Sequence, residues 1–539
     1  MNILSPMRTM PQNQQGDPAR SAATPGGDFD QLPYPSMPFA YTQPTHLAAL
    51  ATLYGLQPPP ADSARVLELG CASGGNIIPL AARFPNAHFV GLDLSAQHIR
   101  DGSRRLATLG LKNIDLREGD LAEAEFAPDT FDYVICHGVF SWVPQAVQES
   151  ILRICRTALT PNGLAVISYN VLPGWHMRSS VREICLYHVD PDAAPRERVA
   201  QARSVLAQIA ELTSETTPYG VFLRNEVKRL KQLPAAYILG EFLSPDNTPM
   251  PFHAFVARAQ QHQLSFLCEA DLGSSVGEML YPAAAERLKA QAGADRLAEE
   301  QYKDFVSGRP FRRSVLTKIS NGDGRLQADL LPDPNRLSAL YVASRLTQDP
   351  SAREGQFRFR DAEGRAITTE DSVVHQALAR LGAAYPSHVQ VEELIRSNPV
   401  QRALPPDVVR ERVCRALFAL VMAQQATLST FPTPSGRAED RHPKVWPLAR
   451  LEASARQPWL TSLTHEPIPA STVDADLIAQ LDGSLDRPAL QALLVQWLRE
   501  GKLSQSIDTP NDKDSIENAA RQYLAGALRH LAQNALLAP

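Results

Sequence analysis

The chain has 539 residues, a net charge of −5 at pH 7, and 44% apolar and 21% charged residues. This length exceeds what one hydrophobic core holds, so we expect two to four domains of roughly 100–200 residues each. The net negative charge argues against a protein that binds nucleic acid through an excess of positive charge. No apolar run approaches the ~20 residues that a membrane span needs, so we expect a cytoplasmic protein without membrane insertion.

Residues 1–30 are rich in Gln, Pro, Gly and Ser and lack the apolar stretch of a secretion signal. We predict that they form a disordered leader. The six cysteines are scattered, without a C-x-x-C pair or zinc spacing. We therefore predict reduced core thiols, no disulfide and no metal site.

Short apolar runs alternate with amphipathic segments between residues 65 and 170. Strands are predicted at Arg65–Leu69, His88–Leu92, Ile114–Glu118, Phe131–His137 and Gly163–Tyr169, the last after a turn at Pro161-Asn162-Gly163. Helices are predicted between them at Ile77–Phe84, Ser95–Leu109 and Gln145–Ala158, with Ser95 as an N-cap. This alternation predicts a doubly wound, Rossmann-like α/β fold, with a parallel sheet covered by helices on both faces.

The pattern changes after Asn170, where residues 177–263 read as mostly helical. Strand-like runs return at Leu264–Glu269 and Phe311–Lys318, and we predict that they are the sixth and seventh strands of the same sheet. The sheet domain would then span 31–320, with 171–263 as a helical insertion over the active-site face.

Two smaller α+β modules are predicted after residue 320. The first, 321–432, has a hairpin, three helices and a strand in an order that resembles a winged helix: Phe357–Asp361, Arg365–Thr369, Ser372–Leu381, Val391–Ser397, Pro406–Gln424 and Ala426–Phe431. The second, 433–539, repeats helix, helix and strand at Ala475–Leu481, Pro488–Glu500 and Leu503–Ser506. Acidic residues offset the arginines of the first module, so we expect protein–protein contacts or a role in framing the substrate, and no nucleic-acid binding.

A glycine-rich turn follows the first strand, in the run Glu68-Leu69-Gly70-Cys71-Ala72-Ser73-Gly74-Gly75-Asn76. Such a turn lets a ligand approach the backbone. A dinucleotide site needs G-x-G-x-x-G for its pyrophosphate. Here the third position is Ala72 and the sixth is Gly75, so the run does not match that pattern, and an acidic residue, Glu68, stands two places before Gly70.

Acidic residues also end the next two strands. Asp93 closes the second strand and could accept hydrogen bonds from two ribose hydroxyls. Asp120 and Leu121 follow the third strand, and His137 closes the fourth. Because ligands of open α/β sheets bind at the carboxyl edge of the strands, we expect these residues to surround one ligand.

These motifs resemble class I S-adenosylmethionine-dependent methyltransferases, whose first motif the glycine-rich turn matches. The segments His137–Val143 and Ser168–Trp175 narrow the resemblance to bacterial members with a methyltransferase regulatory domain, and so do Tyr34–Phe39, Leu233–Leu243 and Asp304–Arg313. The resemblance implies a seven-stranded sheet and S-adenosyl-L-methionine as cofactor. The implied cofactor-binding residues are Glu68, Gly70, Cys71, Ala72, Gly74, Asn76, Asp93, Leu94, Asp120, Leu121 and His137.

The sequence departs from the family in two places. Gly240-Glu241 stands where many relatives have His-Glu, which bears on the choice of substrate. Ala72 replaces a more usual Gly, and we expect it to be tolerated through a negative φ.

The family includes rickettsial enzymes that methylate lysines of outer-membrane proteins. The resemblance thus implies protein lysine N-methylation by in-line transfer, with an outer-membrane or surface protein as one candidate substrate. For this reaction the predicted catalytic residues are Tyr169, Asn170, Trp142 and His137, in a slot walled by Phe140 and Trp175. Tyr34, Phe39 and Tyr41 would form a lid over the cofactor. His137 would face the cofactor or accept a proton.

Two other functions remain open from the sequence. One is a small-molecule N- or O-methyltransferase. The other is a non-catalytic regulatory protein that binds the cofactor and signals through its winged-helix-like modules.

Overall fold

A computed structural model describes residues 31–32, 34–275, 282–293, 295–319, 330–402, 404–503 and 513–539. The predicted leader, 1–30, lies outside these residues. The chain divides into two compact units. One contains the segment up to Pro35 together with Val181–Leu243, and the other contains Ser36–Ser180 and Ser244–Pro539.

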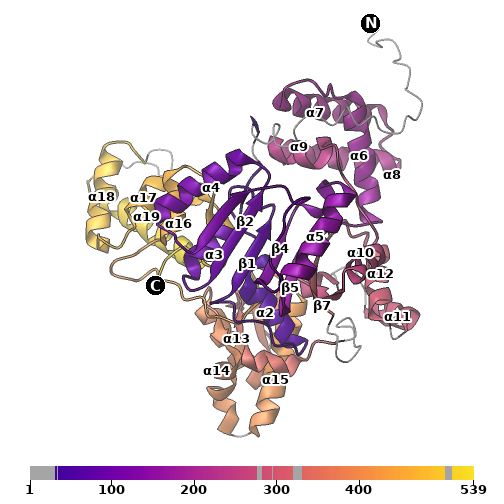
Figure 1. The fold of residues 1–539 in the computed structure, drawn as a ribbon. Helices are drawn as coiled ribbons and strands as arrows, with labels where there is room; N and C mark the ends of the chain where they lie inside the picture. Colours follow the sequence, from indigo (N-terminus) through magenta and orange to yellow (C-terminus); the bar gives the residue numbers. More distant parts are fainter. Residues whose placement is uncertain are drawn as a thin grey trace, which may run out of the picture. The chain divides into compact units, whose positions relative to one another are not determined.

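The larger unit is built on a seven-stranded sheet with the order β3-β2-β1-β4-β5-β7-β6 (Figure 1). Its strands are β1 (Arg65–Leu69), β2 (His88–Asp93), β3 (Ile114–Glu118), β4 (Phe131–Cys136), β5 (Leu159–Asn170), β6 (Leu264–Glu269) and β7 (Phe311–Lys318). The first five are parallel, whereas β7 is antiparallel to both β5 and β6. The predicted doubly wound fold is confirmed, including the sixth and seventh strands.

One detail of β5 differs from the prediction. Pro161-Asn162-Gly163 is not a separate turn, because the strand already begins at Leu159. Phe131 pairs with Leu159 and Tyr133 pairs with Leu164, so the extra residues of β5 between these two pairs form a bulge. The bulge keeps the proline out of the regular ladder, where it could not donate a hydrogen bond.

Helices cover both faces of the sheet because successive strand residues point to opposite sides. Val66 and Tyr133 share one core with α2 (Pro44–Leu53) and α3 (Ile77–Arg83). Leu67 and Val134 share another core with α5 (Gln145–Ala158) and α10 (Phe252–Gln261). The helix α4 (Ala96–Leu109) begins at Ser95, whose hydroxyl accepts a hydrogen bond from the His98 amide at 3.2 Å, as predicted.

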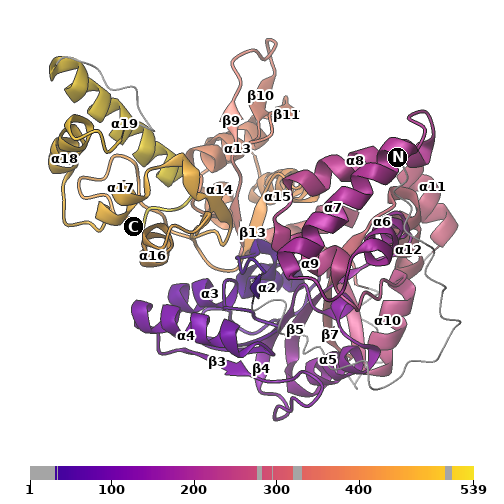
Figure 2. The ribbon, with the colours of Figure 1, turned by 90° about the horizontal axis from the view of Figure 1, so that it is seen from above.

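The smaller unit is helical, in agreement with the prediction for this part of the chain. It contains the second half of α6 (Gly174–His188), together with α7 (Pro195–Leu212), α8 (Pro218–Gln232) and α9 (Ala235–Leu243). Figure 2 shows α7, α8 and α9 side by side. Prolines at the first position begin α7 and α8. Leu206, Leu223 and Phe242 belong to the core of this unit, and Tyr34 lies against Tyr237, with ring centroids 6.2 Å apart.

The first segment after the sheet belongs to the larger unit. The predicted hairpin is confirmed as β10 (Phe357–Arg360) paired with β11 (Ala366–Thr369), and β9 (Thr347–Gln348) pairs with β10. It is followed by α13 (Ser372–Ala384), β12 (Val389–Gln390), α14 (Val391–Arg396), α15 (Pro406–Met422) and β13 (Thr427–Ser429). The strands β12 and β13 pair with β8 (Tyr341–Ala343). Residues of these helices share the core of α2 and α3.

The last segment has a core of its own, which includes Leu448, Leu477, Leu494 and Leu528. Its elements are α16 (Pro447–Ser454), β14 (Trp459–Thr461), β15 (Pro467–Pro469), α17 (Ala475–Gln480), α18 (Arg487–Arg499) and α19 (Lys513–Gln533). Figure 2 shows α16 to α19 gathered together. The strand predicted at Leu503–Ser506 lies, from residue 504 on, outside the described residues.

Across the described ranges, no helix is both long and apolar enough to cross a bilayer. The same residues hold no group of three or more His, Cys, Asp or Glu side chains that could bind a metal ion. All six cysteines are buried and free.

Candidate functional site

The glycine-rich loop between β1 and α3 lies at the carboxyl edge of the sheet. Gly70 and Cys71 donate their amides to the Leu92 carbonyl at 2.8 and 3.0 Å, which fixes the loop against the end of β2. Gly70 has a φ of +74°, and a Cβ there would lie 2.3 Å from a methyl group of Val139. Only glycine satisfies both conditions, so the loop depends on this residue.

The expectation of a negative φ at Ala72 is wrong, because its φ is +47°. The left-handed region costs an L-residue roughly 1–2 kcal/mol. A specific contact accompanies it: the Ala72 amide donates to Asp93 Oδ2 at 2.8 Å. Asp93 therefore anchors the loop, in addition to the role predicted for it.

Asp93 is the acidic residue at the end of β2. Its Oδ1 accepts from the Ser95 amide at 3.0 Å and lies 3.2 Å from His98 Nδ1. A carboxylate has about four acceptor sites, so these contacts leave room for a ligand hydroxyl. The next residue, Leu94, exposes 49% of its surface, which offers an apolar contact at the same edge.

Glu68 and Asn76 form a buried pair beneath the loop. Asn76 Nδ2 donates to Glu68 Oε1 at 2.8 Å, whereas Glu68 Oε2 is buried without a hydrogen-bond partner in the described part of the chain. Burial raises the pKa of Glu68 to about 8, although the Asn76 hydrogen bond acts to lower it. A buried polar atom without a partner is costly, so this oxygen is a candidate for contact with a ligand.

A segment before the sheet, residues 36–42, folds over the glycine-rich loop. Ser36 Oγ accepts from the Gly75 amide at 2.7 Å. The Phe39 amide and the Thr42 hydroxyl both donate to Asn76 Oδ1, at 2.9 and 3.1 Å. These contacts place the segment predicted as part of a lid directly on the loop.

His137 follows β4 and is enclosed by aromatic rings. Tyr41 Oη lies 2.9 Å from His137 Nε2, and the Phe39 ring centroid lies 4.1 Å from the imidazole. The Arg313 guanidinium lies over the Tyr41 ring at 4.2 Å. Burial, with a smaller contribution from Arg313, lowers the pKa of His137 to about 3. His137 is therefore neutral at physiological pH and is a poor proton acceptor there.

Tyr169 is one of the predicted catalytic residues, but its side chain lies in the core. Only 1% of its surface is exposed, and its ring stacks on Phe255 with centroids 4.0 Å apart. Its hydroxyl lies 3.2 Å from Ser314 Oγ, which in turn donates to Glu269 Oε1 at 2.8 Å. This placement favours a packing role for Tyr169.

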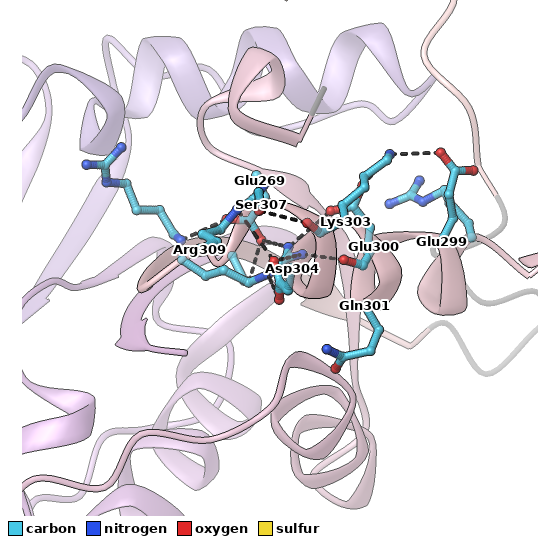
Figure 3. A network of polar contacts seen from close by, with 12 residues as sticks. Glu269, Glu299, Glu300, Gln301, Lys303, Asp304, Ser307 and Arg309 are labelled. Carbon is cyan, nitrogen blue, oxygen red and sulfur yellow. Dashed lines mark hydrogen bonds and ion pairs between the residues drawn. The ribbon is translucent and has the colours of Figure 1, made fainter. Parts of the chain in front are cut away.

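Glu269 belongs to a buried ionic network (Figure 3). Arg312 on β7 donates to Glu269, to Glu300 and, through two nitrogens, to Asp304. Glu300 and Asp304 lie on α12 (Arg296–Ser307). Burial acts to lower the pKa of Arg312, but the carboxylates outweigh it and hold that pKa well above its ordinary value. Arg312 is therefore a permanent cation in the core.

The two other predicted catalytic residues lie close to the end of β5. Asn170 donates its side-chain amide to Asn247 Oδ1 at 3.1 Å and its backbone amide to Ser141 Oγ at 2.8 Å. Trp142 is half-buried, and its ring centroid lies 5.9 Å from that of Trp175. The Trp175 indole N–H is buried and has no acceptor in the ranges that the structure describes. The catalytic roles of Asn170 and Trp142 therefore stay predictions.

Asp120 and Leu121 follow β3, as predicted. Asp120 is exposed, and its carboxylate accepts from the Ala122 amide at 2.8 Å. Leu121 is buried. The predicted residues thus lie at or just after the carboxyl ends of β1, β2, β3 and β4, on one edge of the sheet.

Sequence analysis missed several contacts of the site. His98 has no recognised motif around it, and the recognised segments that contain Ser36 and Arg313 did not predict a contact with the site for either side chain. His465, described below, lies 389 residues from its partner Asn76. No local spacing can reveal such a pair.

Three parts of the chain match known families. Residues 66–163 match a methyltransferase domain, residues 234–318 match the predicted methyltransferase regulatory domain, and residues 441–536 match the PKMT C-terminal winged helix domain. The order of the three matches follows the order of the sheet domain, its final strands and the last segment.

Relatives and solved structures cover almost the whole chain. An uncharacterized protein of Rickettsia prowazekii is 29% identical over 522 residues, which is 94% of this chain and 93% of the relative. A second one from the same organism is 36% identical over 240 residues, 44% of this chain and 96% of the relative. The structure of PKMT2 from Rickettsia typhi is 25% identical, covers 94% of this chain and all of its own, and superimposes with a TM-score of 0.82. The same protein in complex with AdoHcy gives a TM-score of 0.79.

Proposed function

We propose that this chain, which belongs to the class I S-adenosylmethionine-dependent methyltransferases with a methyltransferase regulatory domain, methylates lysine side chains of a protein. One observation carries the choice of substrate: the likeness to PKMT2, a rickettsial protein lysine methyltransferase, extends over 94% of this chain and the whole of that one. It includes the last segment, which also matches the PKMT winged helix domain. Residues outside the sheet domain are the ones available to frame a polypeptide.

The residues at the sheet edge fit the cofactor. S-adenosylmethionine, when bound, supplies a methyl group on a positively charged sulfur. The partnerless Glu68 Oε2 suits the cofactor's amino group, and the remaining acceptor position of Asp93 suits a ribose hydroxyl. Leu94 offers an apolar surface for the adenine ring. The Gly70–Asn76 loop lets the ligand approach the backbone.

The chain's own residues account for the state of the acceptor amine. A lysine amine has a pKa near 10.4 in water and must lose its proton before it can attack. Enclosure in an apolar slot disfavours the ammonium form and lowers that pKa, and the half-buried Trp142 is the ring that we propose for the wall of the slot. The Tyr41 hydroxyl and the neutral His137 imidazole form a polar pair that can accept a hydrogen bond from the amine. Positioning and desolvation then drive the reaction without a strong base.

Transfer of label from methyl-tritiated S-adenosylmethionine to a fractionated cell lysate tests the proposal. We expect acid-stable label on protein bands, mapped to lysines by mass spectrometry. The label should vanish with the Asp93→Ala variant. It should also vanish when the lysate's lysines have first been acetylated, because an amide nitrogen cannot attack the methyl group.

The other outcomes point to different functions. Label confined to the small-molecule fraction would contradict the proposal and favour a small-molecule methyltransferase. Label that survives lysine blocking would assign a different protein acceptor. Cofactor binding without transfer to any fraction would favour a regulatory protein.

A further inference from the structure

A turn in the last segment contacts both ends of α3, the helix that follows the cofactor loop. The turn, Ser462–Glu466, joins β14 to β15, and the helix is α3, Ile77–Arg83. At the start of α3, His465 Nε2 lies 2.9 Å from Asn76 Oδ1. At its end, Arg83 donates to the Leu463 carbonyl at 3.0 Å.

The direction of the first contact follows from the partners of Asn76. Its Nδ2 donates to Glu68, and its Oδ1 accepts from the Phe39 amide and the Thr42 hydroxyl. The atom that faces His465 is therefore an acceptor, so His465 must donate from Nε2–H. Burial lowers the pKa of His465 to about 3, and the imidazole is present as one neutral tautomer.

The backbone of the turn aims the imidazole inward. His465 has a φ of +65°, in the left-handed region that most side chains avoid. The turn is closed by the Ser462 amide on the Glu466 carbonyl at 2.9 Å and by the His465 amide on the Ser462 carbonyl at 3.0 Å. Only 2% of His465 is exposed. A histidine held in this conformation and buried against one amide is a specific contact.

Arg83 adds a second connection between the same two elements. Besides Leu463, it donates to Gln43 Oε1 at 2.8 Å and to Thr433 Oγ1 at 2.5 Å. Gln43 in turn donates to the Thr464 carbonyl at 3.1 Å. These acceptors are uncharged, and burial lowers the pKa of Arg83 to about 10. The turn supplies one of these acceptors, the Leu463 carbonyl, and holds a second one, Gln43, through the Thr464 carbonyl.

We propose that His465 is a positioning residue for the cofactor site, through which the last segment contributes to cofactor affinity. Its hydrogen bond fixes Asn76, and Asn76 fixes Glu68, the buried carboxyl group with a partnerless oxygen beside the Gly70–Asn76 loop. The inference concerns the cofactor alone and holds whichever acceptor the enzyme methylates.

The test compares three variants of the full chain by calorimetric titration with S-adenosylmethionine. His465→Asn keeps a residue that tolerates positive φ but is too short to reach Asn76. His465→Gln keeps an N–H donor near the position of Nε2. His530→Ala removes a histidine of the same segment whose Nε2 contacts Thr472 at 2.8 Å, away from the loop.

Loss of one of the three hydrogen bonds that hold Asn76 Oδ1 should raise the Kd about tenfold in His465→Asn. His465→Gln should restore most of the affinity, and His530→Ala should bind like the wild type. The rise in melting temperature on adding S-adenosylmethionine should shrink in His465→Asn alone.

Wild-type affinity in a folded His465→Asn variant would overturn the proposal. Equal weakening in His465→Asn and His465→Gln, with equal losses of melting temperature, would assign His465 a purely structural role and would also overturn it. Failure to find a lysine substrate would leave these results unaffected, because the titration does not involve the acceptor.

Discussion

A single buried carboxyl, that of Glu68, links the stability of the protein to pH. Its pKa is about 8 in the folded chain, against an ordinary value of 4.5. Between these values the folded state keeps a proton that the unfolded chain has released, so stability falls as pH rises from about 5 to 8. Glu68→Gln removes the titrating group. We expect the stability of the wild type relative to this variant to fall by up to about 1.4 kcal/mol per pH unit.

Melting temperatures of the two proteins at pH 5.5, 6.5 and 7.5, without cofactor, check this expectation. The matched control is Glu118→Gln, which replaces an exposed carboxylate on β3. A constant difference between Glu68→Gln and the wild type across this range would show that Glu68 is ionised in the folded protein.

Strand β7 carries different chemistry on its two faces, because neighbouring strand residues point to opposite sides. Arg312 enters the buried network of Glu269, Glu300 and Asp304, whereas Arg313 covers Tyr41 beside His137. Replacing Arg312 by Met would leave three buried carboxylates without their common cation. We expect a loss of about 3–5 kcal/mol in the free energy of unfolding.

Urea and thermal unfolding of Arg312→Met measure this loss. Arg117→Met is the control, because Arg117 pairs with Asp115 at 2.6 Å while both side chains are about half exposed. Removing such a surface pair should change stability by less than about 0.5 kcal/mol. If Arg312→Met behaved like Arg117→Met, the network would contribute little.

The elements of the sheet could be predicted because each is a local pattern, an apolar strand followed by a turn or an amphipathic helix. Even Leu264–Glu269 and Phe311–Lys318 were found, although the helical insertion separates them from the first five strands. The short strands β14 and β15 were missed, since Pro467 and Pro469 argue against a strand. Ala72 at positive φ was missed because its conformation depends on Asp93, a residue 21 positions away.

The residues of the candidate site could be predicted where they lie in local sequence motifs. Glu68, Asn76, Asp93 and His137 carry motifs and lie at one edge of the sheet. Tyr169 also carries a motif, but its hydroxyl turns to Ser314, on a strand that enters the sheet 145 residues later. His465 and Arg313 reach the site only through tertiary packing, which no spacing in the sequence encodes.

The balance of charges in the C-terminal half argues against nucleic-acid binding. Winged helix domains often bind DNA. The range that matches this domain here, 441–536, contains ten Lys and Arg residues and eleven Asp and Glu residues. In the segment before it, five arginines are paired with acidic side chains: Arg380, Arg396, Arg410, Arg412 and Arg415. Few cations are therefore left for phosphate contacts.

Because phosphate contacts supply most non-specific affinity, we expect the full chain to bind a labelled DNA duplex with a Kd weaker than about 10 µM at 150 mM salt. Fluorescence anisotropy at 50 and 150 mM salt checks this. A Kd below about 1 µM that rises steeply with salt would reveal a basic surface that the paired charges do not suggest. No binding at either salt concentration would instead support a role for these segments in protein contacts and, through His465, in holding the cofactor loop.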